Sequence, residues 1–177
     1  LFMALSRTTI RNTALRGRPP AQALQRANHY IMEDSWSDMF LTAFYGVLNV
    51  ADGRFTYAKA GHNLPLWWQS ETDTFQELDA DGIVLGILEE INLEEREIVV
   101  APRDILVLFT DGVTEAFNEQ EEEFGVERLK TAVHTAIHAT PQPSAQGIIE
   151  GILTAVRAFA QDAPQADDFT LLVVVRQ

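Results

Sequence analysis

Two aspartates occupy positions from which their side chains could bind a metal ion together. Asp111 directly follows the apolar run 104–110, and Asp167 shortly precedes the apolar run 169–175. If both runs are neighbouring strands, the two carboxylates converge at one edge of a sheet. Carboxylate oxygens suit hard cations such as Mg²⁺ and Mn²⁺. Because such ions activate bound water and neutralise phosphoryl oxygens, hydrolysis of a phosphate ester is the chemistry this pair would support.

A purely structural explanation of the same aspartates stays open. An Asp-Gly pair after a strand is commonly a turn, and an Asp-Asp pair before a strand is commonly a cap or a solvated bend. Two carboxylates also leave a metal ion short of protein ligands. The spacing alone therefore indicates a metal site without establishing one.

The histidines and the acidic loop favour structural explanations. His62 lies in a Gly-His-Asn turn and is interpreted as a hydrogen-bonded structural residue rather than a general acid. His134 and His138 are spaced to hold a metal from one helix face, but the neighbouring sequence supplies no third ligand, so we expect exposed residues beside an apolar stripe. The acidic run 119–123 is expected to be a solvated loop. The sequence contains no phosphate-binding glycine loop, no cysteine nucleophile and no Gly-x-Ser-x-Gly elbow.

Hydrophobic periodicity predicts the elements that position these residues. Helices are expected at about 1–15, 20–31, 126–138 and 144–160. Strands are expected at 40–48 and 55–60 as a hairpin, at 66–68 and 75–78, at 98–100 and 104–110 around a proline turn, and at 169–175. The strands 104–110 and 169–175 are apolar almost throughout, so we expect both to be buried. Hairpin connections predict antiparallel sheets with helices outside, an α+β fold.

Composition limits the classes of partner. The chain has 177 residues, 46% of them hydrophobic, which fits a single domain with a real core. Its net charge of −13 argues against nucleic acid or an anionic membrane surface as a partner. The absence of cysteine excludes disulfides and thiolate metal sites, and it fits a cytoplasmic protein. No apolar run approaches the roughly 20 residues of a membrane helix.

Six segments together resemble a known family. They are Phe-Leu-Thr-Ala-Phe-Tyr-Gly at 40–46, Ala-Gly-His-Asn at 60–63, Gly-Ile-Val-Leu-Gly at 82–86, Phe-Thr-Asp-Gly-Val-Thr-Glu-Ala at 109–116, Glu-Phe-Gly at 123–125 and Asp-Asp-Phe-Thr at 167–170. In this order and at these separations they resemble the SpoIIE/RsbU-type branch of the bacterial metal-dependent serine/threonine phosphatases, the 2C-like (PPM) superfamily. No single motif is specific, but six in order cover nearly the whole chain.

The resemblance implies a fold and a site. The fold is a two-sheet antiparallel β-sandwich flanked by helices, with αββα layering and a dinuclear Mn²⁺ or Mg²⁺ site at one end. The family's metal-binding aspartates fall on Asp111 and Asp167, with Gly112 and Asp168 near the site. No side chain serves as nucleophile in this family; a metal-bound water attacks phosphorus in line. His62 inherits no catalytic role.

The sequence also departs from the family pattern. Family members carry a Gly-Asp-x-x-Asp motif and an Asp-x-Ser-Gly-x-Gly motif before a helix like the one at 1–15, and both supply metal ligands. Neither motif is in these 177 residues. We therefore expect a single phosphatase domain, N-terminally truncated, that lacks its first strands and is weak or inactive alone. Unpaired strand edges would favour self-association of this fragment.

The resemblance further implies a substrate and two kinds of partner. The substrate would be a phosphoserine or phosphothreonine on a STAS-type antagonist of an anti-sigma factor, and a sensor or receiver domain would lie upstream in the parent chain. The alternative hypothesis is a degenerate, non-catalytic module that binds a signalling partner, because the absence of the two N-terminal metal-binding motifs agrees with it as well. A third hypothesis is a structural β-sandwich without any ligand.

Overall fold

The computed structural model describes residues 2–34, 39–165 and 167–177. The chain divides into two compact units, one formed by Leu1–His62 with Asp79–Val100 and the other by Asn63–Leu78 with Ala101–Gln177. Each unit contains one antiparallel sheet and a pair of long helices. The predicted α+β class with two antiparallel sheets and flanking helices is therefore confirmed. The predicted helix start at Leu1 lies outside the described residues.

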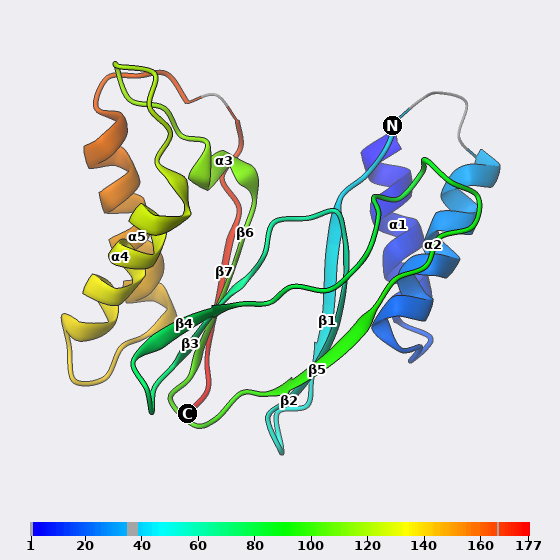
Figure 1. Ribbon diagram of the computed structural model, residues 1–177, viewed down its shortest axis with the longest axis horizontal. Helices are drawn as coiled ribbons and strands as arrows, with labels where there is room; N and C mark the ends of the chain where they lie inside the picture. Colours follow the sequence, from blue (N-terminus) through cyan, green and yellow to red (C-terminus); the bar gives the residue numbers. More distant parts are fainter. Residues whose placement is uncertain (1, 35–38, 166) are drawn as a thin grey trace. The chain divides into compact units, whose positions relative to one another are not determined.

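The first unit carries a three-stranded sheet and two helices (Figure 1). The helices are α1 (Phe2–Ala14) and α2 (Pro20–Asp34), and the strand order is β1 (Ala43–Leu48), β2 (Arg54–Ala60), β5 (Glu95–Val99). Helix α2 packs against β1 and β2 through the side chains whose spacing predicted it, because Leu24, Ala27 and Ile31 are buried. The predicted hairpin of β1 and β2 is confirmed, although β1 begins at Ala43 rather than at Phe40.

The second unit carries a four-stranded sheet with α4 (Gly125–His138) and α5 (Ala145–Ala160) packed on it (Figure 1). Its strand order is β4 (Thr74–Glu77), β3 (Leu66–Gln69), β6 (Ile105–Phe109), β7 (Leu171–Val175), with every neighbouring pair antiparallel. The short helix α3 (Asp111–Thr114) follows β6. Consecutive strands β5 and β6 belong to different sheets, so the proline turn between them does not close a hairpin.

The core of the second unit forms between β6 and the two long helices. β6 is a central strand and four of its five residues are buried, as its continuous apolar sequence predicted. Both helices bury the residues that defined their spacing: Leu129, Val133 and Ile137 in α4, and Ile148, Ile152 and Val156 in α5.

The prediction that the last strand is buried was wrong for most of its length. In β7 only Val173 is buried, and Leu172 is 54% exposed. The reason is its place at the edge of the sheet, where β6 is its one strand neighbour within the ranges that the structure describes. Its apolar sequence resembles that of β6, but position in the sheet decides how much of it is covered.

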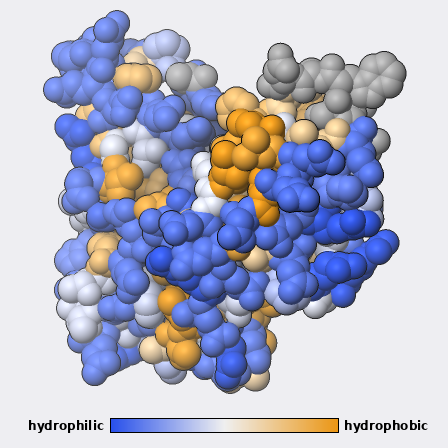
Figure 2. Space-filling model, turned by 45° about the vertical axis from the view of Figure 1, so that its right-hand side comes forward, coloured by the Kyte–Doolittle hydropathy of each residue, from blue (hydrophilic) through white to orange (hydrophobic). Residues whose placement is uncertain are grey.

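The face seen in Figure 2 is mostly hydrophilic, with hydrophobic residues in separate patches. This surface agrees with the net charge of −13. Among the described residues, no helix combines the length and apolar character needed to cross a membrane.

Candidate functional site

Pairing between β6 and β7 brings the two predicted site segments together. Phe109, the last residue of β6, lies opposite Leu171, the first residue of β7. One residue further on, the Thr110 amide donates to the Thr170 carbonyl oxygen at 3.2 Å, and the Thr170 amide donates to Thr110 Oγ1 at 3.1 Å. The segment that follows β6 and the segment that precedes β7 therefore lie side by side at Thr110 and Thr170.

Gly112 lets these two segments approach closely. A Cβ atom at position 112 would lie only 2.7 Å from the carbonyl oxygen of Asp168. The same oxygen accepts a hydrogen bond from Thr110 Oγ1 at 3.3 Å. Glycine is therefore required by a backbone contact, and that contact holds the chain at Asp111 beside the chain at Asp167 and Asp168.

The two aspartates face solvent, and no basic partner lies beside them in the part of the chain that the structure describes. Both are exposed, as is Asp168. Asp111 Oδ1 accepts from the Gly112 amide at 3.0 Å, and Asp167 Oδ1 accepts from the Asp168 amide at 2.7 Å. Within the described ranges, neither carboxylate forms an ion pair with a lysine, arginine or histidine.

These residues fit a hard divalent cation. Two exposed carboxylates on adjacent backbone segments, neither paired with a basic side chain of the described residues, present oxygen ligands to an ion. Mg²⁺ in particular is usually held by one or two carboxylates while it keeps several water molecules. The donor set therefore matches the predicted Mn²⁺ or Mg²⁺, and the ligand roles of Asp111 and Asp167 stay a prediction.

A second cluster of ligand atoms was missed from the sequence. His134 Nε2 and His138 Nε2 each lie 3.2 Å from a carboxylate oxygen of Asp73. Both histidines are exposed on α4, as expected, and the third ligand atom comes from a distant part of the sequence rather than from the neighbouring residues. Asp73 is 61 positions from His134 in the chain. Their helical spacing identified the pair, whereas nothing in the local sequence pointed to Asp73.

Hydrogen bonds in this cluster stabilise the charged form of Asp73. The bond with His138, and next the bond with His134, lower the pKa of Asp73 from its ordinary value. Trp68 Nε1 adds a third bond to the same carboxylate, at 2.9 Å. Asp73 therefore presents a carboxylate, not a carboxylic acid, to the two imidazoles at neutral pH.

His62 and the acidic loop have the environments expected of structural residues. Thr42 Oγ1 and His62 Nδ1 are 3.0 Å apart, which is a hydrogen bond between neighbouring loops of the first unit. Residues 119–123 are exposed, and Asn118 Oδ1 accepts from the amides of Gln120 and Glu122 to order their turn.

Solved structures with a similar fold are phosphatase-type domains. The RsbU and RsbW domains of Rv1364c from Mycobacterium tuberculosis match 99% of this chain and 48% of their own, with a TM-score of 0.81 and 20% identity. The SiaA-PP2C domain of Pseudomonas aeruginosa matches over 97% of this chain and 66% of its own, with a TM-score of 0.79 and 22% identity. At such identities the similarity shows the fold alone, which is that of PP2C-type domains.

The family follows from the sequence. The model of the SpoIIE family, described as Stage II sporulation protein E, matches residues 1–177, so the chain belongs to this family, as its motifs predicted. The phosphoserine phosphatase RsbU of Bacillus subtilis is 32% identical over 163 residues, covering 91% of this chain and 46% of RsbU. The chain spans less than half the length of the curated relatives it matches.

Proposed function

We propose that residues 1–177 form the phosphatase domain of a metal-dependent phosphoserine/phosphothreonine protein phosphatase. The observation that carries this proposal is the pair Asp111 and Asp167, two exposed carboxylates on adjacent backbone segments without a basic partner among the described residues. Membership of the SpoIIE family supports it, as does similarity to a relative named a phosphoserine phosphatase. A single family model over both compact units supports treating them as one domain.

In this proposal Asp111 and Asp167 are metal ligands, and Gly112 and Asp168 shape their surroundings. A bound Mn²⁺ or Mg²⁺ would supply an activated water and neutralise charge on the phosphoryl oxygens. Thr110 fixes the backbone of Asp168 and Thr170 through its hydroxyl group, which keeps the segment carrying Asp167 in place. Because two carboxylates fill only part of a coordination sphere, and the two other ligand-bearing family motifs are not in the sequence, we expect low turnover from these 177 residues alone.

For the physiological substrate we propose a phosphorylated STAS-type protein in a sigma-factor partner-switching pathway. The similarity to RsbU supports this choice, together with the structural similarity to a chain that carries RsbU and RsbW domains. The greater length of the relatives supports a sensor or receiver domain elsewhere in the parent protein. A cytoplasmic location belongs to the same proposal and agrees with the absence of cysteine.

The test is Mn²⁺-dependent hydrolysis of an aryl phosphate by the full-length protein. We expect Asp111→Asn and Asp167→Asn each to lower kcat/KM by about 100-fold or more, equivalent to roughly 2.7 kcal/mol of transition-state stabilisation. Asp162→Asn is the matched control, because Asp162 is an exposed aspartate on the same connection between α5 and β7. It should leave kcat/KM within about twofold. Turnover that survives both site variants would reject these ligand assignments.

The alternative function is a non-catalytic module that binds a signalling protein. The missing family motifs are the observation that favours it. The full-length protein would then show no Mn²⁺-dependent turnover but would still bind a STAS-type partner in a pull-down with purified components. Failure to bind Mn²⁺ together with failure to bind such a partner would instead favour a purely structural sandwich.

A further inference from the structure

The cluster of Asp73, His134 and His138 has the composition of a transition-metal site. Among the described residues, these three side chains form a group that could hold a metal ion, because their ligand atoms all lie within 4.8 Å of one another. We propose that these three side chains bind one Zn²⁺ ion. The proposal uses no residue of the carboxylate site and does not depend on the proposed phosphatase activity.

The distances in the cluster match the edges of a zinc coordination tetrahedron. Zinc bonds of 2.0–2.2 Å to histidine nitrogen and carboxylate oxygen separate neighbouring ligand atoms by about 3.3–3.5 Å. His134 Nε2 lies 3.2 Å from Asp73 Oδ2 and His138 Nε2 lies 3.2 Å from Asp73 Oδ1, so each distance is close to one such edge but ends on a different carboxylate oxygen. Zinc binding by both imidazoles and one carboxylate oxygen therefore requires the half-exposed Asp73 carboxylate to turn toward one shared position. Three protein ligands leave the fourth position to water or to a further ligand.

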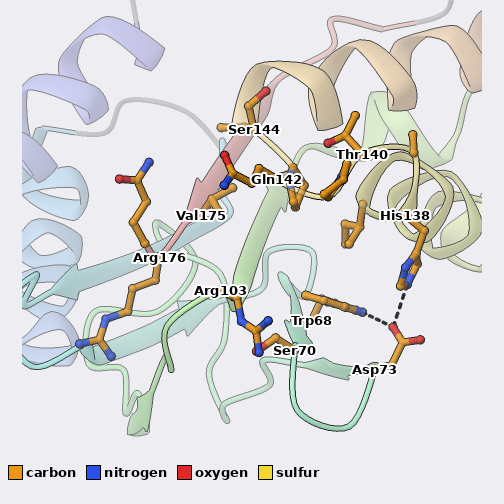
Figure 3. Close-up of a pocket in the computed structure, with 16 residues that line it drawn as sticks. Trp68, Ser70, Asp73, Arg103, His138, Thr140, Gln142, Ser144, Val175 and Arg176 are labelled. Carbon is orange, nitrogen blue, oxygen red and sulfur yellow. Dashed lines mark hydrogen bonds and ion pairs between the residues drawn. The ribbon is translucent and has the colours of Figure 1, made fainter.

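Local structure holds each ligand toward the others. His134 and His138 are one turn apart on α4, so their rings lie on the same helix face, with centroids 4.3 Å apart. Asp73 lies in the β3–β4 turn with φ of 53°, a left-handed conformation that aspartate tolerates better than most residues. Trp68 Nε1 donates to Asp73 Oδ1 at 2.9 Å, and Figure 3 shows Trp68 and His138 meeting the Asp73 carboxylate from two sides. Such an outer hydrogen bond orients a metal-binding carboxylate.

An ion can reach this cluster from solvent. The side chains of His134, His138 and Asp73 are each about half exposed. Asp73 and His138 also line an open cavity of about 1140 Å³, the one shown in Figure 3. The nearest lysine along α4, Lys130, is already paired with Glu77 and Glu127 at 2.9 and 2.8 Å, so its charge is compensated.

The cluster and the carboxylate pair lie at opposite ends of β6. Trp68, next to the turn that carries Asp73, pairs with Ile105, the first residue of β6. Asp111 follows the last residue of β6, and the five-residue strand between them is on the order of 16 Å long. The ligands differ in kind as well, because imidazole suits Zn²⁺ whereas an all-oxygen set suits Mg²⁺ or Mn²⁺. Zinc would therefore bind selectively in the presence of excess magnesium.

The effect of zinc would be to fasten the β3–β4 turn to the end of α4. Both are parts of the second unit, and the ion would replace two hydrogen bonds with coordinate bonds. Because this geometry exists only in the folded chain, zinc binding would raise the midpoint of thermal unfolding in proportion to the logarithm of its concentration above the Kd.

Calorimetric titration of the metal-free chain with Zn²⁺, in millimolar Mg²⁺, tests the site directly. We expect one zinc ion per chain. His134→Gln, His138→Gln and Asp73→Asn should each weaken binding by about 100-fold or more, because loss of an outer-sphere partner alone costs 10–100-fold. His29→Gln is the matched control, since His29 is an exposed helical histidine whose Nε2 lies 3.2 Å from Glu33 Oε1, and the described residues place no second imidazole in a ligand cluster with it. It should bind zinc as the unchanged chain does.

Absence of zinc uptake by the folded chain would overturn the proposal, and so would variants that bind within about threefold of the unchanged chain. The same variants, checked by circular dichroism, should also lose the zinc-dependent rise in the unfolding midpoint. X-ray absorption at the zinc edge, measured on the unchanged chain, does not depend on how the variants fold. It should show imidazole scattering from two histidines, and a ligand shell without imidazole would reject the site.

Discussion

Replacement of Gly112 by alanine tests the backbone contact on which the carboxylate site depends. The added Cβ would lie 2.7 Å from the Asp168 carbonyl oxygen and 3.2 Å from its carbon. To reach an ordinary contact distance of about 3.4 Å, the added Cβ and the Asp168 carbonyl oxygen must move apart by about 0.7 Å. The carbonyl oxygen and carbon of Asp168 are backbone atoms and the Cβ is fixed to the backbone of residue 112, so no side-chain rotation can supply this displacement. The segments at Asp111 and Asp167 must therefore move apart.

The expected cost has two parts. Overpacking of a closely fitted contact costs about 1–3 kcal/mol, which for a chain of this size lowers the unfolding midpoint by roughly 2–12 °C. A displacement approaching 1 Å at a catalytic site lowers the rate by up to about 100-fold. We therefore expect Gly112→Ala to reduce both thermal stability and Mn²⁺-dependent hydrolysis of an aryl phosphate in the full-length protein.

Gly147→Ala is the control for adding a methyl group. Gly147 lies in the first turn of α5, and its nearest neighbour to a Cβ is Ser144 Oγ at 3.2 Å, which is a side-chain atom that can adjust. Alanine is favoured over glycine in a helix by up to about 1 kcal/mol, so stability should hold or rise and activity should be unchanged. If Gly112→Ala behaves like Gly147→Ala in both assays, the close approach of Gly112 to Asp168 is refuted.

Two further predictions concern stability. Asp104 is 2% exposed and accepts hydrogen bonds from Trp67 Nε1 and from the amides of Ser70 and Ala101. Asp104→Ala leaves these three donors without their acceptor, so the free energy of unfolding, measured by denaturant titration, should fall by about 3 kcal/mol or more. A fall below about 1 kcal/mol would contradict this expectation. The hydrogen bond from Lys59 lowers the pKa of Asp79 below its ordinary value of 3.8, so the pair stabilises the fold above about pH 4 and loses this contribution as the pH falls through the lowered pKa. Asp79→Asn should therefore be less stable than the unchanged chain near about pH 6, and this difference in the free energy of unfolding should shrink as the pH falls below about 4; a difference that does not change with pH would contradict this expectation.

Local patterns in the sequence predicted the elements well because each pattern depends on residues close in the chain. The apolar spacing of Leu129, Val133 and Ile137 predicted a helix whose buried face is the observed one. The short connection between the strands expected at 40–48 and 55–60 predicted the hairpin of β1 and β2. Asp111 and Asp167 lie close to the predicted strand ends, because a strand tends to end near a polar pair; Asp111 follows β6, which ends at Phe109, and Asp167 precedes β7, which begins at Leu171.

Position within a sheet was not predictable in the same way. β6 and β7 have equally apolar sequences, yet β6 is central and covered while β7 is at an edge and partly exposed. β5 and β6 are neighbours in sequence but pair in different sheets. Strand pairing joins residues that are far apart in the chain. Which strands pair therefore depends on all the strands together, and the residues within one strand do not indicate its neighbours.

The sequence by itself determined the family, the order of the strands and the four long helices, and the two aspartates expected to bind metal; the short helix α3 was not predicted. Tertiary structure alone decided that Asp168 packs on Gly112 and that Asp73 meets His134 and His138. The physical reason is the same in both cases. The type of a side chain and its local spacing determine which ligand atom it can supply. The pairing of β6 with β7, and the packing of α4 beside the β3–β4 turn, determine which distant side chain it meets.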